Sequence, residues 1–334
     1  MKQLTKYLLI LFIALIIHGC GDGGAGNDDT PLKTQDYIAI DQKIAKPLAS
    51  EAYQAINQTN DQADRLSGSV KSANTSHPEH PDLSNPLKLS RWAVSQWGAQ
   101  VSQSGTARMS VRSATPRATE SEVLDCDVAG TAKLTIKASD AEELSPGDQL
   151  IIEYDQCDYG DGSTINGSIS FTFNEFQSED NFNVTMLLDA NVLTNNEVGV
   201  IKGDVTVIAN KENGVTTTTV TSDRFYIRKD DEGSLVENLK TTLIENGTHY
   251  ELDYDAEFTT DSIDGKVTID TDPNFQGDTR KPYPDTGVMI ITGANSTYLQ
   301  LNADTGNNAT LYLTVYDGST TTSEEITWNE LETL

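Results

Sequence analysis

Apolar and polar residues alternate with a period of two over much of the chain from about Ser121 onward. This alternation is typical of β-strands that bury one face and expose the other to water. The clearest runs cover residues 132–136, 165–173, 205–208, 267–269 and 311–315. Turn-forming sequences lie between them, including Pro146-Gly147-Asp148, Asp161-Gly162, Asn213-Gly214, Asn246-Gly247, Asp264-Gly265 and Asp317-Gly318. We expect about a dozen strands, paired antiparallel with their sequence neighbours because the connections are short.

A short motif recurs within these strands, in which a glycine follows two positions after an apolar residue. It occurs in "VAGTAKLTI", "INGSISFTF", "IKGDVTVIA" and "IDGKVTIDT", which begin at Val128, Ile165, Ile201 and Ile263. Glycine within a strand marks a bend or bulge of a curled sheet. The motif is either a repeat of about two strands or a chance recurrence in a β-rich chain.

Before the strands, the period of the apolar residues is helical. Residues 46–65 have apolar side chains at helical spacing, with Pro47 in the first turn, where proline is tolerated. A linker is expected over residues 67–86, and a second helix begins at Asn85-Pro86, an N-cap followed by a first-turn proline. The second helix would place on one side Leu89, Trp92, Ala93 and Trp97.

These patterns predict a mainly β fold. We expect a large antiparallel meander curled into an open or half barrel, preceded by one or two amino-terminal helices. One apolar and one polar face, together with strong curvature, favour this arrangement. A closed barrel and a two-sheet sandwich are the alternatives.

The amino terminus has the order of a secretory signal. Lys2 and Lys6 precede an almost wholly apolar run over residues 7–17, which is shorter than the roughly 20 residues that a membrane-spanning helix requires. The sequence Ile17-His18-Gly19-Cys20 resembles the lipobox of bacterial lipoproteins, in which the signal is removed before the cysteine. His18 departs from the small or apolar residue usual at that place. An ordinary signal peptide with a chance cysteine is the alternative.

The resemblance to lipoproteins implies a lipid anchor at Cys20. It implies a diacylglycerol thioether on that cysteine and an amino terminus acylated by a fatty acid such as palmitate, and more than one buried chain gives stable anchoring. Gly21 rather than Asp follows the cysteine, which in such lipoproteins implies delivery to the outer membrane. The glycines after Cys20 imitate a dinucleotide-binding loop, but no apolar helix follows them, so this class of site is excluded.

Charge divides the chain into two parts. Residues 20–118 carry ten acidic and ten basic side chains, whereas residues 119–334 carry 41 acidic and 11 basic ones. A domain this acidic repels phosphate backbones, so DNA and RNA are excluded as partners. Residues 86–118 contain five basic residues and no acidic one. This segment lies either along the acidic domain of its own chain, which we favour, or along anionic lipid headgroups.

Two cysteines remain after lipidation, Cys126 and Cys157. Exported proteins meet an oxidising compartment, so we expect a disulfide between them. Two buried free thiols are the alternative.

The search for catalytic and metal-binding residues finds little. There is no G-x-S-x-G motif, and the histidines that survive processing are His77, His80 and His249. We expect no enzyme activity and no cofactor. Asp155, Asp158 and Asp161 form a partial match to a calcium loop, without the full order of ligands or the terminal glutamate. A solvated acidic turn is the favoured interpretation, here and for residues 270–274.

The β region also resembles uncharacterised Gram-negative lipoproteins that have a cysteine before a "GT" strand and another after a "PGD" strand. The matching residues here are Cys126, Gly130-Thr131, Pro146-Gly147-Asp148 and Cys157. The resemblance implies the β fold and the disulfide, and no activity.

Together, these observations predict a lipid-anchored lipoprotein of the outer membrane. Residues 1–19 form the signal peptide, 20–34 a flexible tether, 35–120 a helical leader with a linker, and 121–334 the acidic antiparallel β domain. Its expected partners are the membrane, through the anchor, and a hydrophobic ligand or an envelope protein. The expected role is binding or structural, and a periplasmic carrier of lipid on the concave face of a half barrel is the alternative.

Overall fold

The computed structural model of the chain describes residues 36–60, 118–126, 128–139, 144–158, 163–178, 180–194, 197–229, 232–261, 263, 265–303, 306 and 309–333. The helices in this part are α2 (Ala45–Asn60), the 3-10 turn η1 (Ala294–Ser296) and α5 (Trp328–Glu332). The strands are β1 (Ala118–Asp125), β2 (Ala129–Ala138), β3 (Asp148–Asp158), β4 (Ser163–Ser178), β5 (Asn181–Thr194), β6 (Glu197–Glu212), β7 (Val215–Lys229), β8 (Glu232–Asn246), β9 (His249–Thr260), β10 (Gly265–Thr271), β11 (Phe275–Asp278), β12 (Val288–Thr292), β13 (Tyr298–Asn302), β14 (Thr310–Tyr316) and β15 (Thr321–Thr327).

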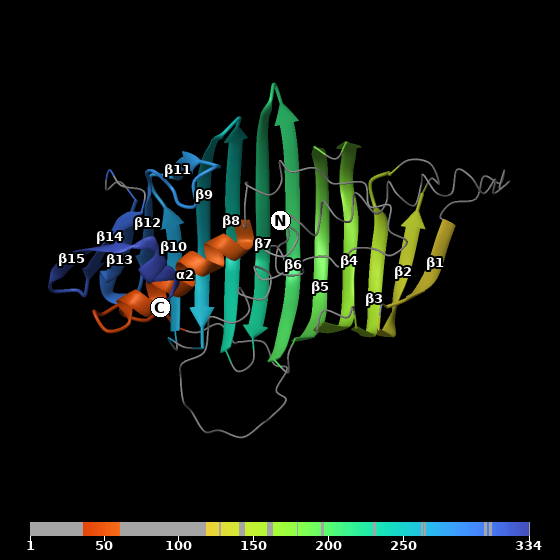
Figure 1. Ribbon diagram of the computed structural model, residues 1–334, viewed down its shortest axis with the longest axis horizontal. Helices are drawn as coiled ribbons and strands as arrows, with labels where there is room; N and C mark the ends of the chain where they lie inside the picture. The colour runs from red at the N-terminus through yellow and green to blue at the C-terminus, as the bar shows by residue number, and fades with distance from the viewer. Residues whose placement is uncertain are drawn as a thin grey trace, which may run out of the picture.

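All of these strands belong to one antiparallel sheet (Figure 1). Each strand pairs with the next from β1 to β10 and then through β12 to β15, while β11 lies off this path and pairs with β9. The path ends at β1 on one side and at β15 on the other, so the sheet is not closed into a barrel. The prediction of an open antiparallel meander is therefore confirmed, and the closed barrel and the two-sheet sandwich are excluded.

The alternation seen in the sequence gives the sheet two different faces. We call the inner face the side that carries Ile152, Phe171, Met186, Val207 and Tyr254, all of which are buried. The register places these side chains on one side, because Phe171 lies opposite Met186 and Val207 lies opposite Val220. The outer face carries the intervening, mostly polar positions, as expected from the pleat of a strand.

The glycine motif coincides with irregularities of the sheet. Gly130, Gly167 and Gly203 all have positive φ angles, and a shift of register lies beside each of them in the pairing of β2, β4 and β6. A Cβ atom on Gly203 would lie 2.4 Å from the carbonyl oxygen of Arg224 on β7, so only glycine fits there. The fourth glycine differs: Gly265 begins β10 and lies against the side chain of Ile38, not in a turn.

Helix α2 packs on the inner side of the sheet. Its buried side chains follow one stripe at helical spacing, as the sequence predicts: Ala45, Leu48, Ala49, Ala52 and Tyr53. They belong to the same core as the inner-face residues. The helix contacts β13 and α5, and it crosses β10 and β9 towards β8 (Figure 1). The expected start near residue 46 is confirmed, while residues 61–65 and the second expected helix lie outside the described residues.

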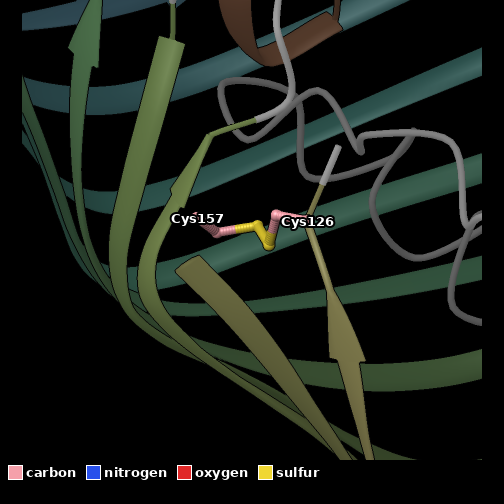
Figure 2. Close-up of a disulfide and its surroundings, with 2 residues drawn as sticks. All are labelled: Cys126 and Cys157. Atoms are coloured by element: carbon pink, nitrogen blue, oxygen red, sulfur yellow. A yellow bond between two sulfur atoms is a disulfide. The ribbon is translucent and has the colours of Figure 1, made fainter. Parts of the chain in front are cut away.

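The disulfide between Cys126 and Cys157 is present. Cys126 follows the end of β1, Cys157 lies in β3, and their Cα atoms are 5.5 Å apart. Cys157 is fully buried on the inner face, opposite Ile165 of β4. Figure 2 shows the strands bending around the bonded pair. The bond therefore links the edge strand to the third strand of the sheet.

Among the described residues, no helix combines the length and the apolar character needed to cross a membrane.

Candidate functional site

The inner face of β4, β5 and β6 is one candidate for a binding surface. Its central rows are cross-strand sets in register: Phe171 lies opposite Met186, which lies opposite Val205, and Phe173 lies opposite Val184. Each of these five side chains is 0% exposed. Side chains of this size each contribute on the order of 2 kcal/mol when removed from water. An apolar surface this continuous is stable only when another layer of atoms covers it.

A few polar groups interrupt this face at β7 and β8. The Ser222 hydroxyl donates to the carbonyl oxygen of Asp204 at 2.6 Å, and the Thr241 hydroxyl donates to that of Asp253 at 2.9 Å. The hydroxyl of Thr218 is buried and has no hydrogen-bond partner among the described residues. The face is therefore suited to apolar groups over β4–β6 and is slightly polar beyond them.

The carboxy-terminal end of the inner face is closed by an aromatic cluster. The fully buried Trp328 of α5 stacks on Tyr283 at 5.5 Å between ring centroids and meets Tyr53 of α2 at 4.8 Å. The Nζ of Lys46 lies 3.2 Å from Glu324 and 3.4 Å from Glu330, which adds ion pairs at the rim. Helix α2 is thereby fixed to α5 and β15.

Burial also changes the acidity of a carboxylate beside this cluster. The pKa of Glu332 is raised because the half-buried carboxylate loses water, and the hydrogen bond from the Tyr283 hydroxyl opposes this only in part. Burial together with the negative charge of Glu332 raises the pKa of Tyr283. The Tyr283–Glu332 hydrogen bond therefore joins α5 to residues near β11, while the charge of the half-buried carboxylate is disfavoured there.

On the outer face, a buried lysine joins the amino-terminal segment to the sheet. Lys266 of β10 forms ion pairs with Glu257 and, at 3.8 Å, with Glu237. The Tyr37 hydroxyl donates to Glu257 at 2.7 Å, and the ammonium lies 5.3 Å from the centre of the Tyr37 ring. The backbone N–H of Ile38 donates to Lys266, so residues 36–38 add to the edge of β10.

The charges in this cluster satisfy one another. The ammonium of Lys266 and the hydroxyl of Tyr37 hold the pKa of Glu257 below its ordinary value. Burial opposes the charged form of Lys266, but the hydrogen bond to Glu257 leaves its pKa raised. The cluster ties residues 36–38 to β9 and β10.

Carboxylates gather on the outer face of β9 and β10. Burial raises the pKa of Asp270, and so does the charge of Asp255, Asp272 and Asp253. The repulsion raises the question of a bound cation. Within the part of the chain that the structure describes, no group of three or more His, Cys, Asp or Glu residues is arranged to hold a metal ion. The carboxylates alone do not define a metal site.

Two cavities lie away from the inner face. One of about 270 Å³ is lined by residues from Pro273 and Asn274 to Asn302, near β11 and β12. The other, of about 190 Å³, lies on the outer face at the bulge of Gly203, between Leu187 and Arg224. Neither brings together residues that form a recognisable catalytic set.

The structure brings together only some of the residues expected to form sites. Cys126 and Cys157 are bonded. Asp155 and Asp158 both lie in β3 beside the disulfide, while Asp161 and the lipidation residue Cys20 lie outside the described residues. The calcium loop and the lipid anchor therefore remain predictions.

The histidines add no catalytic set. His249 begins β9 at an exposed position, opposite Asn246 of β8 and Asp278 of β11. His77 and His80 lie outside the described residues.

Sequence reasoning missed the Lys266 cluster and the Trp328 cluster. Both depend on contacts between residues more than 200 positions apart, such as Tyr37 with Glu257 and Tyr53 with Trp328. One signal was available for the first cluster: Lys266 is a basic residue in an otherwise acidic alternating stretch, where a buried ion pair is a reasonable expectation.

Comparisons with protein-family models, with curated proteins and with solved structures found no match to this chain.

Proposed function

We propose that this protein is a lipid-anchored lipoprotein of the outer membrane, with a binding or structural role and no catalytic activity. The observation that carries the proposal is the combination of a lipobox ending at Cys20 with a Cys126–Cys157 disulfide in the folded part. The lipobox marks a chain for export and acylation, and a disulfide persists where the compartment is oxidising.

The position at which the chain enters the fold supports the same proposal. Residues 36–38 pair with β10, and Cys20 precedes them by a glycine- and aspartate-rich segment. At about 3.3–3.6 Å per extended residue, this segment could reach some 50 Å from a membrane surface to the sheet. The acidic sheet can therefore stand clear of anionic headgroups while it remains anchored.

Replacing the lipidated residue tests this proposal. Cys20→Ser is expected to move the protein from the outer-membrane fraction to soluble fractions, or to leave it as an unprocessed precursor, because no acyl chain can be attached. Immunoblots of sucrose-gradient membrane fractions measure the change, with Gly23→Ala as the matched control that should stay in the membrane. Equal membrane retention of both variants would contradict a lipid anchor at Cys20.

A second candidate role is a carrier of an acyl chain or a similar hydrophobic ligand. The apolar and continuous inner face of β4–β6, with Phe171 and Met186 at its centre, favours it. This role requires the inner face to be available to a ligand, and what covers that face therefore decides between the two.

A further inference from the structure

The inner face of β4–β6 is covered, and the described elements do not account for the cover. Phe171, Met186 and Val207 are 0% exposed. Within the described part of the chain, β4, β5 and β6 pack broadly only against their neighbours in the sheet, and α2 makes its contacts at β13 and α5. None of the described elements makes broad contact across this face, which points to a cover from elsewhere in the chain.

The course of the chain limits what this cover is. Helix α2 leaves β13 on the inner side and runs towards β8, where it ends at Asn60. The chain is next described at Ala118, the start of β1 at the opposite edge of the sheet. Seven strand spacings separate β8 from β1, roughly 34 Å at 4.7–4.9 Å each. Residues 61–117 must span this width, and they start from the inner side.

The composition of residues 86–117 matches the surface that the chain must cross. Leu89, Trp92, Ala93 and Trp97 fall on one side of a helical pattern, which provides large apolar groups for an apolar face. The segment has five basic residues and no acidic one, while residues 119–334 carry 41 acidic against 11 basic side chains. Because both belong to one chain, the effective concentration of the segment at the sheet is high.

We propose that residues 86–117 dock on the inner face of β4–β6, with Trp92 and Trp97 against Phe171 and Met186. The segment then forms the second layer of the domain. Its apolar side chains lie on the apolar face, and its basic residues point away from that face, within the field of the acidic domain. Docking of this kind does not depend on lipidation at Cys20, so the experiments below test it independently of the lipoprotein proposal. It does exclude a free acyl-binding trough on this face.

Hydrogen–deuterium exchange of the full-length protein, read by peptide mass spectrometry, tests the docking. The amides of residues 86–97 are expected to exchange at least about tenfold more slowly than in an unstructured chain, because docking hides them from solvent. Residues 21–34 provide an internal reference and should exchange at the unstructured rate. Exchange of residues 86–97 at that same rate would overturn the proposal.

Two neighbouring substitutions on β5 provide matched variants. Met186 points to the inner face and is 0% exposed, whereas Leu187 points outward and is 58% exposed. Met186→Ala is expected to speed exchange of residues 86–97 by roughly threefold or more, and Leu187→Ala to leave it unchanged. Equal effects of the two variants, with the sheet still protected, would overturn the proposal. If Met186→Ala unfolds the sheet, the wild-type measurement decides alone.

Fluorescence gives an independent reading. The chain has three tryptophans, so a full-length Trp328→Phe variant reports on Trp92 and Trp97 alone. Docking predicts blue-shifted emission and iodide quenching several-fold weaker than in urea. Native mass spectrometry of the same protein separates other occupants. A bound acyl lipid together with fully quenched tryptophans would overturn the proposal and favour the carrier role, and protection that appears only in a dimer would assign the face to a second copy.

Discussion

Single glycines control where the sheet bends. Gly203 has a φ of +144°, a conformation that L-residues with a Cβ rarely adopt, and a Cβ there would also meet the backbone of β7. Gly199, in the same strand, has no such φ, and an added Cβ would find only ordinary contacts at 3.5 Å or more. Of these two glycines in one strand, Gly203 is therefore required by backbone geometry, whereas nothing in the surroundings of Gly199 requires a glycine.

This difference predicts opposite outcomes of the same substitution. Gly203→Ala is expected to lower the free energy of unfolding by about 1–3 kcal/mol, because the strained backbone and the close contact must both be accommodated. Gly199→Ala should leave it unchanged or slightly raised, since alanine reduces the entropy of the unfolded chain. Urea denaturation followed by far-UV circular dichroism measures both. Similar losses for the two variants would contradict this role of Gly203.

Glu332 predicts a dependence of stability on pH. Its pKa is raised in the folded protein because burial disfavours the carboxylate, so the folded state binds the proton more tightly than the unfolded state. The charged form of Glu332 therefore lowers the stability of the protein. This loss is absent below the ordinary pKa of the carboxyl group and fully present above its raised pKa in the folded protein. Glu332→Gln should raise the unfolding free energy at about pH 7.5 by roughly 0.5 kcal/mol, a small value because water still reaches the half-buried group.

The check compares urea denaturation at about pH 7.5 and about pH 4, where the gain should become small because Glu332 is then mostly protonated, as neutral as the glutamine that replaces it. Glu325→Gln, at an exposed position of β15, is the matched control for the effect of the same substitution without burial. A gain of equal size at both pH values would point to packing and not to the charge.

At the scale of elements, the disulfide holds the edge of the sheet. It closes a loop of 31 residues between the end of β1 and β3, and among the described strands β1 otherwise pairs with β2 alone. Cys126→Ala/Cys157→Ala is expected to lower the unfolding free energy by on the order of 3–4 kcal/mol through the entropy of loop closure.

Guanidinium denaturation measures this loss, with Cys20→Ser as the control that leaves the disulfide intact. Unchanged stability of the double variant would mean that β1 and β2 separate before the rest of the sheet unfolds. Exchange of the β1 amides would then show the loss locally.

Several elements could be predicted from the sequence because their causes are local. Strict alternation at residues 165–173 predicts β4, and the turn pair Asn213-Gly214 predicts the hairpin between β6 and β7. The start of α2 followed from a helical stripe and Pro47. Asp264-Gly265 also marks the connection from β9 to β10, and Gly265 itself begins β10. A Cβ on Gly265 would meet Ile38, a contact with a distant segment that the local sequence does not reveal.

For the whole molecule, the order of strands follows from local signals, whereas the open sheet was favoured over a closed barrel only by the expected faces and curvature. Short connections dictate that neighbours pair, as with β7 and β8. Whether the ends meet depends on the sum of twist and bulges over all strands, and no local pattern contains that sum. The inner face was expected to be concave and apolar, but its burial at Phe171 depends on long-range packing. The clusters around Lys266 and Trp328 also depend on contacts between distant parts of the chain, so the local sequence does not predict them.

The pairing of strands in chain order affects how the protein unfolds. Almost every strand contacts only the strands before and after it, so stability accumulates along the chain as in a repeat protein. Loss of structure can then begin at an end of the sheet and spread inward. The end at β15 is secured by α5 and Trp328, and the end at β1 by a covalent bond. Reduction of the Cys126–Cys157 bond would therefore release the β1 end of the sheet, while the β15 end stays packed against α5.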